Sequence, residues 1–591
     1  MTFSKKHTII PLTVILVCIF ARGFFLYYMN AYPLASLCKE LTIDTLQNNP
    51  FELHFNIAHP EEMGFENIST DLIPYNAQTY RTGNAWSVYK EKIQAITSDS
   101  LNQDDLLLYR LLQRHIDLQA QSEAFPYYEN PLSLSGGVHN QMPILLSEYT
   151  LRSKSDIENY FKLLIQIPAY LDGIAQYALD QEKNGIFQYS GAISQVRSQC
   201  LSLFPDTLLD QNRHFLQTGF RAQLDTLTSK GILTNKEADD YMMRHTLLLK
   251  TKIVPAYHAL AQKMQALKGC PEPKGLSRLP KGKEYYNLLL AASTGSGRSI
   301  PEIKDLLFDR YDFLYQAIRA LPSSDIQMPK DFINLGSYKD MLAHLHQSSQ
   351  THFPSLETIN EDTMQHVTLK KTDGILAEMS APAFYLTPPI DAGNEHVIYI
   401  NPTADRDPLS MYTTLAHEGF PGHLYQTAYS QNALTKAGAP LLRHLLYYGG
   451  FTEGWAVYAE LYSYDFLTDF YGSPYKEYFS SIRYNRELQL CICSILDILI
   501  HYDGKTLAET EEILQMLGLN ASNTETIYQT ICDAPANYPK YYVGYLEILD
   551  LKETAEVLWK ENYSDYAFHQ WLLETGGGDF ETLQLLLTEK D

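Results

Sequence analysis

The chain has 591 residues, enough for two or three domains or for one large helical body with a catalytic half. Its composition of 45% apolar and 19% charged residues is that of a globular protein and excludes wholesale disorder. The formal net charge of −23 argues against a nucleic-acid partner, because phosphate binding needs a basic face. Seven scattered cysteines are too few for a disulfide scaffold, and the sequence leaves open whether Cys200 and Cys270 pair.

The N-terminal segment, residues 1–35, is expected to be a signal or a membrane anchor. Lys5 and Lys6 precede an apolar run, and a helix over residues 8–29 would measure about 33 Å, enough to cross a bilayer. No A-x-A cleavage site follows, and valine precedes Cys18 where a lipoprotein signal needs a small residue. The pattern favours an uncleaved anchor with the body outside the cell. A cleaved signal and a buried cytosolic helix are the alternatives.

Most of the chain after this segment is expected to be helical. The stretch DIENYFKLLIQIPAYLDGIAQYALDQEKNG (156–185) carries apolar residues at three- and four-residue spacing and ends at glycine. The proline- and glycine-rich segment CPEPKGLSRLPKGK (270–283) is the best candidate for a linker. It separates an N-terminal helical region, 36–270, from a C-terminal region, 284–591, which carries the motifs that follow. The predicted fold class is mainly α.

Strand signal is concentrated in one place. The runs AFYLT (383–387) and HVIYIN (396–401) are rich in β-branched and aromatic residues and are joined by a turn-rich connection. They predict a small hairpin just before the histidine motif described next. A strand edge beside a catalytic site could bind an extended peptide by main-chain pairing.

The stretch LAHEGFPGHLYQ resembles a zinc-protease helix, but its two histidines, His417 and His423, are six residues apart instead of four. On a regular helix, positions i and i+6 lie roughly 120° apart and cannot share one metal ion. Pro421 cannot sit inside a helix, since it lacks the N–H group and its ring clashes with the preceding turn. Gly422 then supplies backbone freedom. These two residues are therefore expected to break the helix and to let His423 approach His417.

A zinc site needs a third protein ligand and an open position. The segment FTEGWAVYAELY contains Glu453 at the start of a helical run and Glu460 seven residues later. The two carboxylates lie on nearly the same helix face but about 10 Å apart along the axis, so they cannot both bind the metal. Glu453 is the predicted ligand, and Glu460 is given a possible supporting role.

The chemistry expected of this set is metal-assisted hydrolysis of an amide. Two neutral imidazoles and one carboxylate would hold a single Zn²⁺ ion and lower the pKa of a bound water to about 7. Glu418, adjacent to a ligand, is placed to take the proton of that water and pass it to the leaving amine. The residues alone also allow a chance arrangement, because helices contain many glutamates.

Several stretches together resemble one bacterial family of zinc peptidases, catalogued as domain of unknown function 885. Its hallmark H-E-x-x-P-G-H with a glutamine three positions later matches residues 417–426, and a downstream E-G-W-A matches residues 453–456. Further similar blocks are LLSEYTLRSKSDIENYFKLL, YYNLLLAASTGSGRSIPEI, the hairpin ending in Tyr399-Ile400-Asn401, LDILIHYDGKT and PANYPKYYVGYLEIL. The resemblance runs from about residue 40 to the end.

The resemblance implies a mostly helical fold of the gluzincin type, with zinc bound by two histidines and a distant glutamate. It also implies that a tyrosine of the C-terminal block stabilises the oxyanion, a role that a phenol O–H can fill. Tyr541 is the candidate by position, with Tyr542 and Tyr545 as rivals. Asp497 and His501 also fall on family-like positions, where they would orient substrate or protonate a leaving group, or else form an ion pair along one helix.

The sequence therefore predicts an exported zinc-dependent peptidase, attached to the membrane through its N-terminal segment. A metal-dependent amidohydrolase acting on a non-peptide amide is one alternative, and a non-catalytic extracellular helical binding protein is another. The expected partner is a peptide or a small amide and no nucleic acid. The sequence does not indicate the substrate, the choice between endo- and exo-cleavage, or the oligomeric state.

Overall fold

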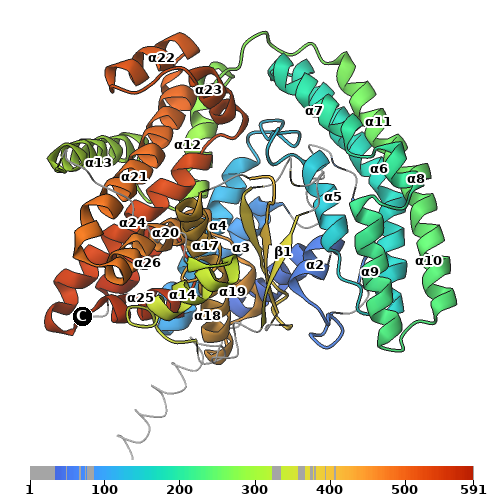
Figure 1. Cartoon of the computed structure of the whole chain (residues 1–591), viewed down its shortest axis with the longest axis horizontal. Helices are drawn as coiled ribbons and strands as arrows, with labels where there is room; N and C mark the ends of the chain where they lie inside the picture. Colours follow the sequence, from blue (N-terminus) through green and yellow to red (C-terminus); the bar gives the residue numbers. More distant parts are fainter. Residues whose placement is uncertain are drawn as a thin grey trace, which may run out of the picture.

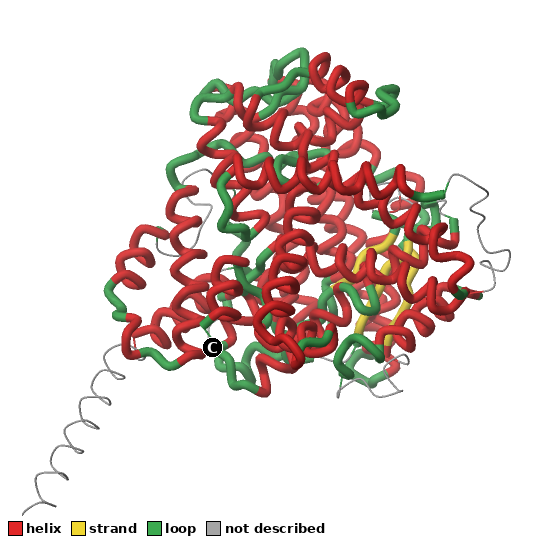
Figure 2. The backbone as a smooth tube through the Cα atoms, turned by 90° about the vertical axis from the view of Figure 1, so that its left-hand side faces the viewer, coloured by secondary structure: helices red, strands yellow, loops and turns green. Residues whose placement is uncertain are grey.

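The computed structural model describes residues 33–589 except 48, 66–67, 74, 76–84, 323–334, 357–365, 373–376, 378–380, 393–394 and 405–406. The predicted anchor at residues 8–29 lies outside the described residues. None of the helices in the described part combines the length and apolarity that a bilayer crossing needs. The fold is mainly α, as the sequence predicts, with one small sheet among the helices (Figure 2).

Most helices of the N-terminal region, over residues 138–264, share a hydrophobic core of their own, whereas residues 86–116 pack in a separate cluster with Leu442 of the C-terminal region. After helical residues 33–46, its α-helices are α2 (Pro50–Asn56), α3 (Trp86–Gln94), α4 (Gln103–Ser122), α5 (Val138–Glu148), α6 (Lys154–Lys183), α7 (Ser190–Ser202), α8 (Asp206–Asp210), α9 (Phe215–Ser229), α10 (Asn235–Leu248) and α11 (Val254–Lys263). The long α6 is capped by a box in which Ser153 and Asp156 bond each other's backbone. Its buried face packs against α11, with Tyr160, Phe161 and Ile167 almost fully inside.

The C-terminal region holds the larger core and the predicted site. Its α-helices are α12 (Gly282–Thr294), α13 (Ile300–Ala320), α14 (Tyr338–Ser349), α17 (Pro408–Glu418), α18 (His423–Lys436), α19 (Leu441–Leu445), α20 (Gly449–Tyr471), α21 (Lys476–Ile498), α22 (Leu507–Met516), α23 (Thr524–Asp533), α24 (Asn537–Trp559), α25 (Asp565–Thr575) and α26 (Phe580–Thr588). Figure 1 shows these helices at the left, α5–α11 at the right, and the sheet between the two groups.

The sheet has three strands in the order β1-β3-β2. β2 (Ala383–Leu386) and β3 (His396–Ile400) form the predicted antiparallel pair, and β1 (Val367–Lys371) adds to β3 in parallel. β1 was not expected from the sequence, although its run VTLKK begins with a β-branched pair. β2 is thus an edge strand, and β3 is the central one.

The proline-rich segment 270–283 is packed against the C-terminal region. An added Cβ at Gly275 would lie 2.0 Å from the carbonyl oxygen of Ile500, so only glycine allows this approach. The backbone N–H of Leu276 donates to Nδ1 of His501 at 3.1 Å. The sulfur atoms of Cys200 and Cys270 are both free.

Two helices of the C-terminal core, α20 and α24, cross at very short range. An added Cβ at Gly454 would meet the carbonyl carbon of Gly544 at 2.3 Å, and one at Gly544 would meet the carbonyl oxygen of Gly450 at 2.2 Å. The backbones can approach this closely only because all three positions lack a side chain. The crossing brings the start of α20 and the start of α24 together, and both carry predicted site residues.

Candidate metal centre

The helix that carries His417 ends where the sequence predicts. α17 stops at Glu418, and the next helix begins at His423. The chain reverses over residues 419–422, and the rings of His417 and His423 then lie face to edge with centroids 4.8 Å apart. The structure therefore brings together two histidines that a continuous helix would hold apart.

Gly422 is required for a different reason from the one predicted. Its φ of −79° is not the left-handed conformation that favours glycine. Instead, an added Cβ would sit 1.8 Å from the carbonyl oxygen of His417 and 2.4 Å from that of Ala416. The turn is held from the other side by Trp455, whose Nε1–H donates to the carbonyl oxygen of Pro421 at 2.8 Å.

The carboxylate of Glu453 faces both imidazoles. Its Oε2 lies 3.3 Å from Nε2 of His423 and 3.8 Å from Nε2 of His417. Donor atoms that bind one tetrahedral zinc ion at 2.0–2.1 Å are about 3.3 Å from each other. The spacing and the chemistry of this nitrogen, nitrogen and oxygen set therefore fit a zinc ion. Ligand atoms of Glu418 also lie within 4.8 Å of the two histidines, but a hydrogen bond described below holds this carboxylate to β2.

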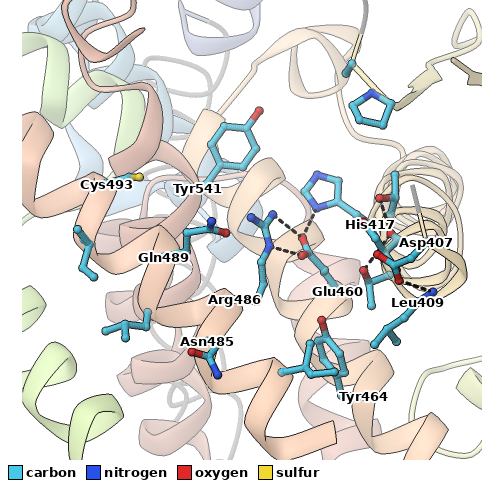
Figure 3. Close-up of a pocket in the computed structure, with 18 of the residues that line it drawn as sticks. Asp407, Leu409, His417, Glu460, Tyr464, Asn485, Arg486, Gln489, Cys493 and Tyr541 are labelled. Carbon is cyan, nitrogen blue, oxygen red and sulfur yellow. Dashed lines mark hydrogen bonds and ion pairs between the residues drawn. The ribbon is translucent and has the colours of Figure 1, made fainter. Parts of the chain in front are cut away.

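Glu460 supports His417 from the opposite side of the ring. Its Oε2 lies 3.3 Å from Nδ1 of His417, so Nε2 is the nitrogen left to face the metal. Arg486 of α21 holds this carboxylate through Nε at 2.6 Å and Nη2 at 3.4 Å. Figure 3 shows the chain of contacts from Arg486 through Glu460 to His417. Sequence reasoning proposed Glu460 as a support but missed Arg486, which no spacing rule links to the motif.

The electrostatics of the cluster favour a cation. Burial raises the pKa of Glu460, but Arg486 and His417 outweigh burial and lower that pKa to about 2. Burial likewise opposes ionisation of Glu453, yet hydrogen bonds from both histidines hold its pKa well below the usual range. Burial lowers the pKa of His417, while Glu453 and Glu460 raise it to about 10. Positive charge is thus stabilised where the donor atoms converge.

Glu418 contacts the sheet. Its Oε2 accepts the backbone N–H of Tyr385 in β2 at 2.8 Å. The backbone groups of Phe384 and Leu386 face β3, so the N–H of Tyr385 lies on the outer edge of β2. The carboxylate of Glu418 consequently stands between the two histidines and a strand edge.

Tyr541, the candidate oxyanion donor given by the family resemblance, lies beside His417. Its ring is 6.3 Å from the ring of His417, at 28°. Burial, followed by the charge of Glu453, holds the pKa of Tyr541 well above its usual range, so the phenol keeps its proton. The neighbouring Lys540 places Nζ 4.9 Å from the centre of the Tyr541 ring and 3.6 Å from Oε1 of Glu453. Lys540 was not singled out from the sequence.

The comparisons with known proteins agree with the motif. A model of the family described as "Bacterial protein of unknown function (DUF885)" matches residues 74–584. The chain belongs to this family. The family description assigns no activity, and no curated protein sequence matches this DUF885 chain.

Two solved structures share the fold of this DUF885 protein. A candidate lipoprotein from Colwellia psychrerythraea superposes with a TM-score of 0.79 at 16% identity, covering 94% of this chain and 98% of that chain. A candidate lipoprotein of unknown function from Shewanella oneidensis has a TM-score of 0.54 at 16% identity, covering 85% of this chain and 91% of that chain. At this identity, the likeness concerns the fold.

The DUF885 structure does not bring His501 to the cluster. His501 is fully buried, with Nδ1 bonded to the N–H of Leu276 and Nε2 to the carbonyl oxygen of Ile531 at 2.9 Å. Both ring nitrogens are occupied by backbone, so neither is available to a substrate. The predicted pairing with Asp497 is also absent, because α21 passes into a wider turn at residues 499–503 and Asp497 instead accepts from the hydroxyl of Tyr286 at 2.7 Å.

The two rival tyrosines are likewise engaged elsewhere in the DUF885 fold. Tyr542 is fully buried and its hydroxyl donates to Glu487 at 3.1 Å. Tyr545 is 1% exposed and packs against Tyr542 and Tyr458. Of the three tyrosines, Tyr541 alone lines the cavity at the histidines.

A cavity of about 1020 Å³ opens at the cluster of this DUF885 protein. His417, Glu418 and Tyr541 line one end, and Ala383 of β2 forms part of the wall. The cavity continues along one face of α21, where its lining residues run from Tyr478 to Leu496. That stretch of helix is about 27 Å long, the length of roughly eight residues of extended peptide.

Proposed function

We propose that this protein is a zinc-dependent peptidase. The observation that carries the proposal is the approach of Glu453 to both His417 and His423, with the carboxylate of Glu418 within 4.8 Å of the two histidines. A purely structural metal site needs no such base. The three proposed ligands come from three helices, α17, α18 and α20, and the turn at residues 419–422 brings two of them together.

The residues around the ligands fit the steps of amide hydrolysis. A zinc ion held by the three ligands would supply Lewis acidity, lowering the pKa of water to about 7 and polarising the scissile carbonyl. Glu418 takes the proton of the attacking water and delivers it to the leaving nitrogen. Tyr541, which keeps its proton, donates a hydrogen bond to the carbonyl oxygen as negative charge develops there.

The position of β2 at the outer edge of the sheet favours a peptide as the substrate. Since the N–H of Tyr385 faces this edge, the backbone groups of Ala383, two residues earlier, face it as well. An extended peptide paired with β2 would run past Glu418 with its main chain held in register. The length of the cavity along α21 leaves room for several residues on the other side of the metal.

We place the enzyme outside the cytoplasm and attached to the membrane. The lysines and apolar run at the N-terminus support this location. The two structural relatives, both described as candidate lipoproteins, support the same location. The retention of the full chain in the membrane fraction of its host tests it.

The test of the activity pairs zinc content with peptide hydrolysis. Glu418→Gln is expected to retain one zinc ion per chain and to lose hydrolysis of a mixed peptide library. Glu453→Gln is expected to lose zinc as well, because it removes a ligand. Glu512→Gln, an exposed carboxylate on α22, is the matched control and keeps both. A Glu418→Gln variant as active as its parent would overturn the mechanism.

A further inference from the structure

A second large cavity lies over the open face of the sheet. It measures about 890 Å³ and is enclosed by α2, the turn after α5, α9 and the strands. Phe384 and Tyr399 stack on each other in its floor, with ring centroids 4.8 Å apart. The cavity thus belongs to both regions of the chain, and no step of the proposed hydrolysis uses it.

The charged residues described around this cavity are mostly basic. The cationic residues are Arg152, Lys230, Lys370 and Lys371, and the carboxylates are Glu148 and Glu395. Glu148 is already engaged, because it accepts the hydroxyl of Tyr399. The chain has a net charge of −23, so acidic residues outnumber basic ones overall. The excess of basic residues around this cavity is therefore a local feature.

Arg152 is the cation set deepest in the wall. It is half-buried, and among the described residues no carboxylate lies within ion-pair distance of its guanidinium. Burial lowers the pKa of Arg152, and the more distant charges of Asp156 and Asp391 only partly oppose this. Both of these carboxylates are bonded to backbone N–H groups. A desolvated cation without a direct partner is stabilised by an anion that enters the cavity.

His54 adds a polar atom beside Arg152. Its ring stacks on Tyr149 at 3.6 Å and 5°, which fixes the orientation of the imidazole. Nε2 of His54 is buried and has no hydrogen-bond partner among the described residues. His54 and Arg152 both line this cavity, and Tyr149, on which His54 stacks, lies three residues before Arg152 in the chain. A guanidinium and an imidazole lining one cavity suit a carboxylate.

β2 joins this cavity to the metal centre. Ala383 lines the first cavity, whereas Phe384 and Leu386 line the second. Side chains of a strand paired with β2 would alternate between the two faces of the sheet, so every second one would face the basic cavity. Along the chain the cavity runs from Phe384 to Pro389, four residues past Tyr385, which contacts Glu418. Four residues of extended chain span about 13 Å.

We infer that the basic cavity binds a carboxylate of the peptide substrate, within about four residues of the scissile bond, through Arg152, His54 and Lys370. This inference rests on the proposed peptidase function and gives it a substrate class, peptides with an acidic group on one side of the cleaved bond. The carboxylate can be an acidic side chain or a free C-terminus, since both present the same two oxygens.

The test uses decapeptides that differ only in the position of one Glu, each with a matched Gln peptide, blocked or free at the C-terminus. With zinc-loaded full-length protein, kcat/KM for the best Glu peptide is expected to exceed that of its Gln partner at least about tenfold. Arg152→Gln and Lys370→Gln should each reduce this ratio. Arg213→Gln, an exposed arginine of the same region, is the control. If Glu peptides with blocked C-termini are preferred over their Gln partners, the cavity binds the Glu side chain. If the preference appears only for peptides with a free C-terminus, the cavity binds the terminal carboxylate.

Binding of the same fluorescein-labelled peptides to the Glu418→Gln variant separates this inference from the proposed activity. If the zinc-loaded parent cleaves peptides but neither cleavage nor binding distinguishes Glu from Gln, the carboxylate subsite is refuted and the peptidase stands. If no peptide is cleaved while the labelled Glu peptides still bind more tightly in an Arg152-dependent way, the peptidase is refuted and the anion site stands. If the Glu preference persists in both Arg152→Gln and Lys370→Gln, the assignment of these residues is refuted.

Discussion

Replacement of Gly422 by alanine is predicted to abolish tight zinc binding while the fold persists. The new Cβ would lie 1.8 Å from the carbonyl oxygen of His417, whereas real contacts of this kind do not fall below 3.0 Å. The backbone of the two helices must therefore separate by at least about 1.2 Å. Metal ligands tolerate displacements of about 0.2 Å. We expect zinc affinity to fall by at least about 100-fold, and the free energy of unfolding of the metal-free protein to fall by about 1–3 kcal/mol through overpacking.

The assay measures zinc affinity by competition with a chromophoric chelator, together with melting temperatures with and without zinc. The parent should gain stability from zinc, because a ligand that binds only the folded state stabilises it by about 2.7 kcal/mol at 100 times its Kd. Gly422→Ala should show almost no gain. Gly219→Ala is the matched control, since an added Cβ there, in α9, meets nothing within 4 Å. It should bind zinc normally and be no less stable than the parent.

One result would refute the reasoning directly. If Gly422→Ala binds zinc within about threefold of the parent at unchanged melting temperature, the close approach of residues 416–417 to residue 422 does not set the ligand geometry. The site would then tolerate a backbone displacement that zinc coordination forbids. The assignment of His417 and His423 as ligands to one ion would fall with it.

Three further changes probe the surroundings of the site. Glu460→Gln should lower zinc affinity about 10- to 100-fold in the chelator assay, because the carboxylate orients His417 through Nδ1; an unchanged affinity would limit Glu460 to packing. Tyr541→Phe should lower kcat/KM for peptides roughly 100-fold with zinc retained, and an equal loss in Tyr542→Phe would point to a structural effect. Burial raises the pKa of Asp497 to about 7, above the value of about 3.9 in an unfolded chain. The folded state therefore holds this proton more tightly, and the free energy of unfolding should fall on the order of 4 kcal/mol as the pH rises from about 4 to 7. Asp497→Asn should flatten that slope in urea titrations, and an unaltered slope would contradict the shift.

The parts of the site that could be predicted from the sequence are those set by local backbone chemistry. Pro421 cannot continue a helix, so a break between the two histidines was required. The ending of α17 at Glu418 and the new start at His423 agree with that requirement. The seven-residue spacing of Glu453 and Glu460 likewise excluded binding of one ion by both, and the structure places them on opposite nitrogens of His417.

The features that escaped prediction depend on contacts between distant elements. Arg486 and Lys540 come from α21 and α24, and nothing in their own neighbourhood shows that each will face a buried carboxylate. The role expected for His501 was wrong because both of its nitrogens are taken by backbone of two other segments, which periodicity does not reveal. β1 was missed because two of its five residues are exposed lysines, which are uncommon in strands, so the run of β-forming residues is short.

The close crossing of α20 and α24 explains why the motif around Glu453 contains a glycine. Glu453 precedes Gly454, where α24 approaches to within backbone contact at Gly544. Tyr541 lies three residues before Gly544, nearly one helical turn, and so projects toward the same face. A side chain at either glycine would push the helices apart and carry Tyr541 away from the ligand carboxylate. The proposed third zinc ligand and the proposed oxyanion donor are therefore positioned by the close contact between these glycines, and Trp455 bonds the same helix to the turn that precedes His423.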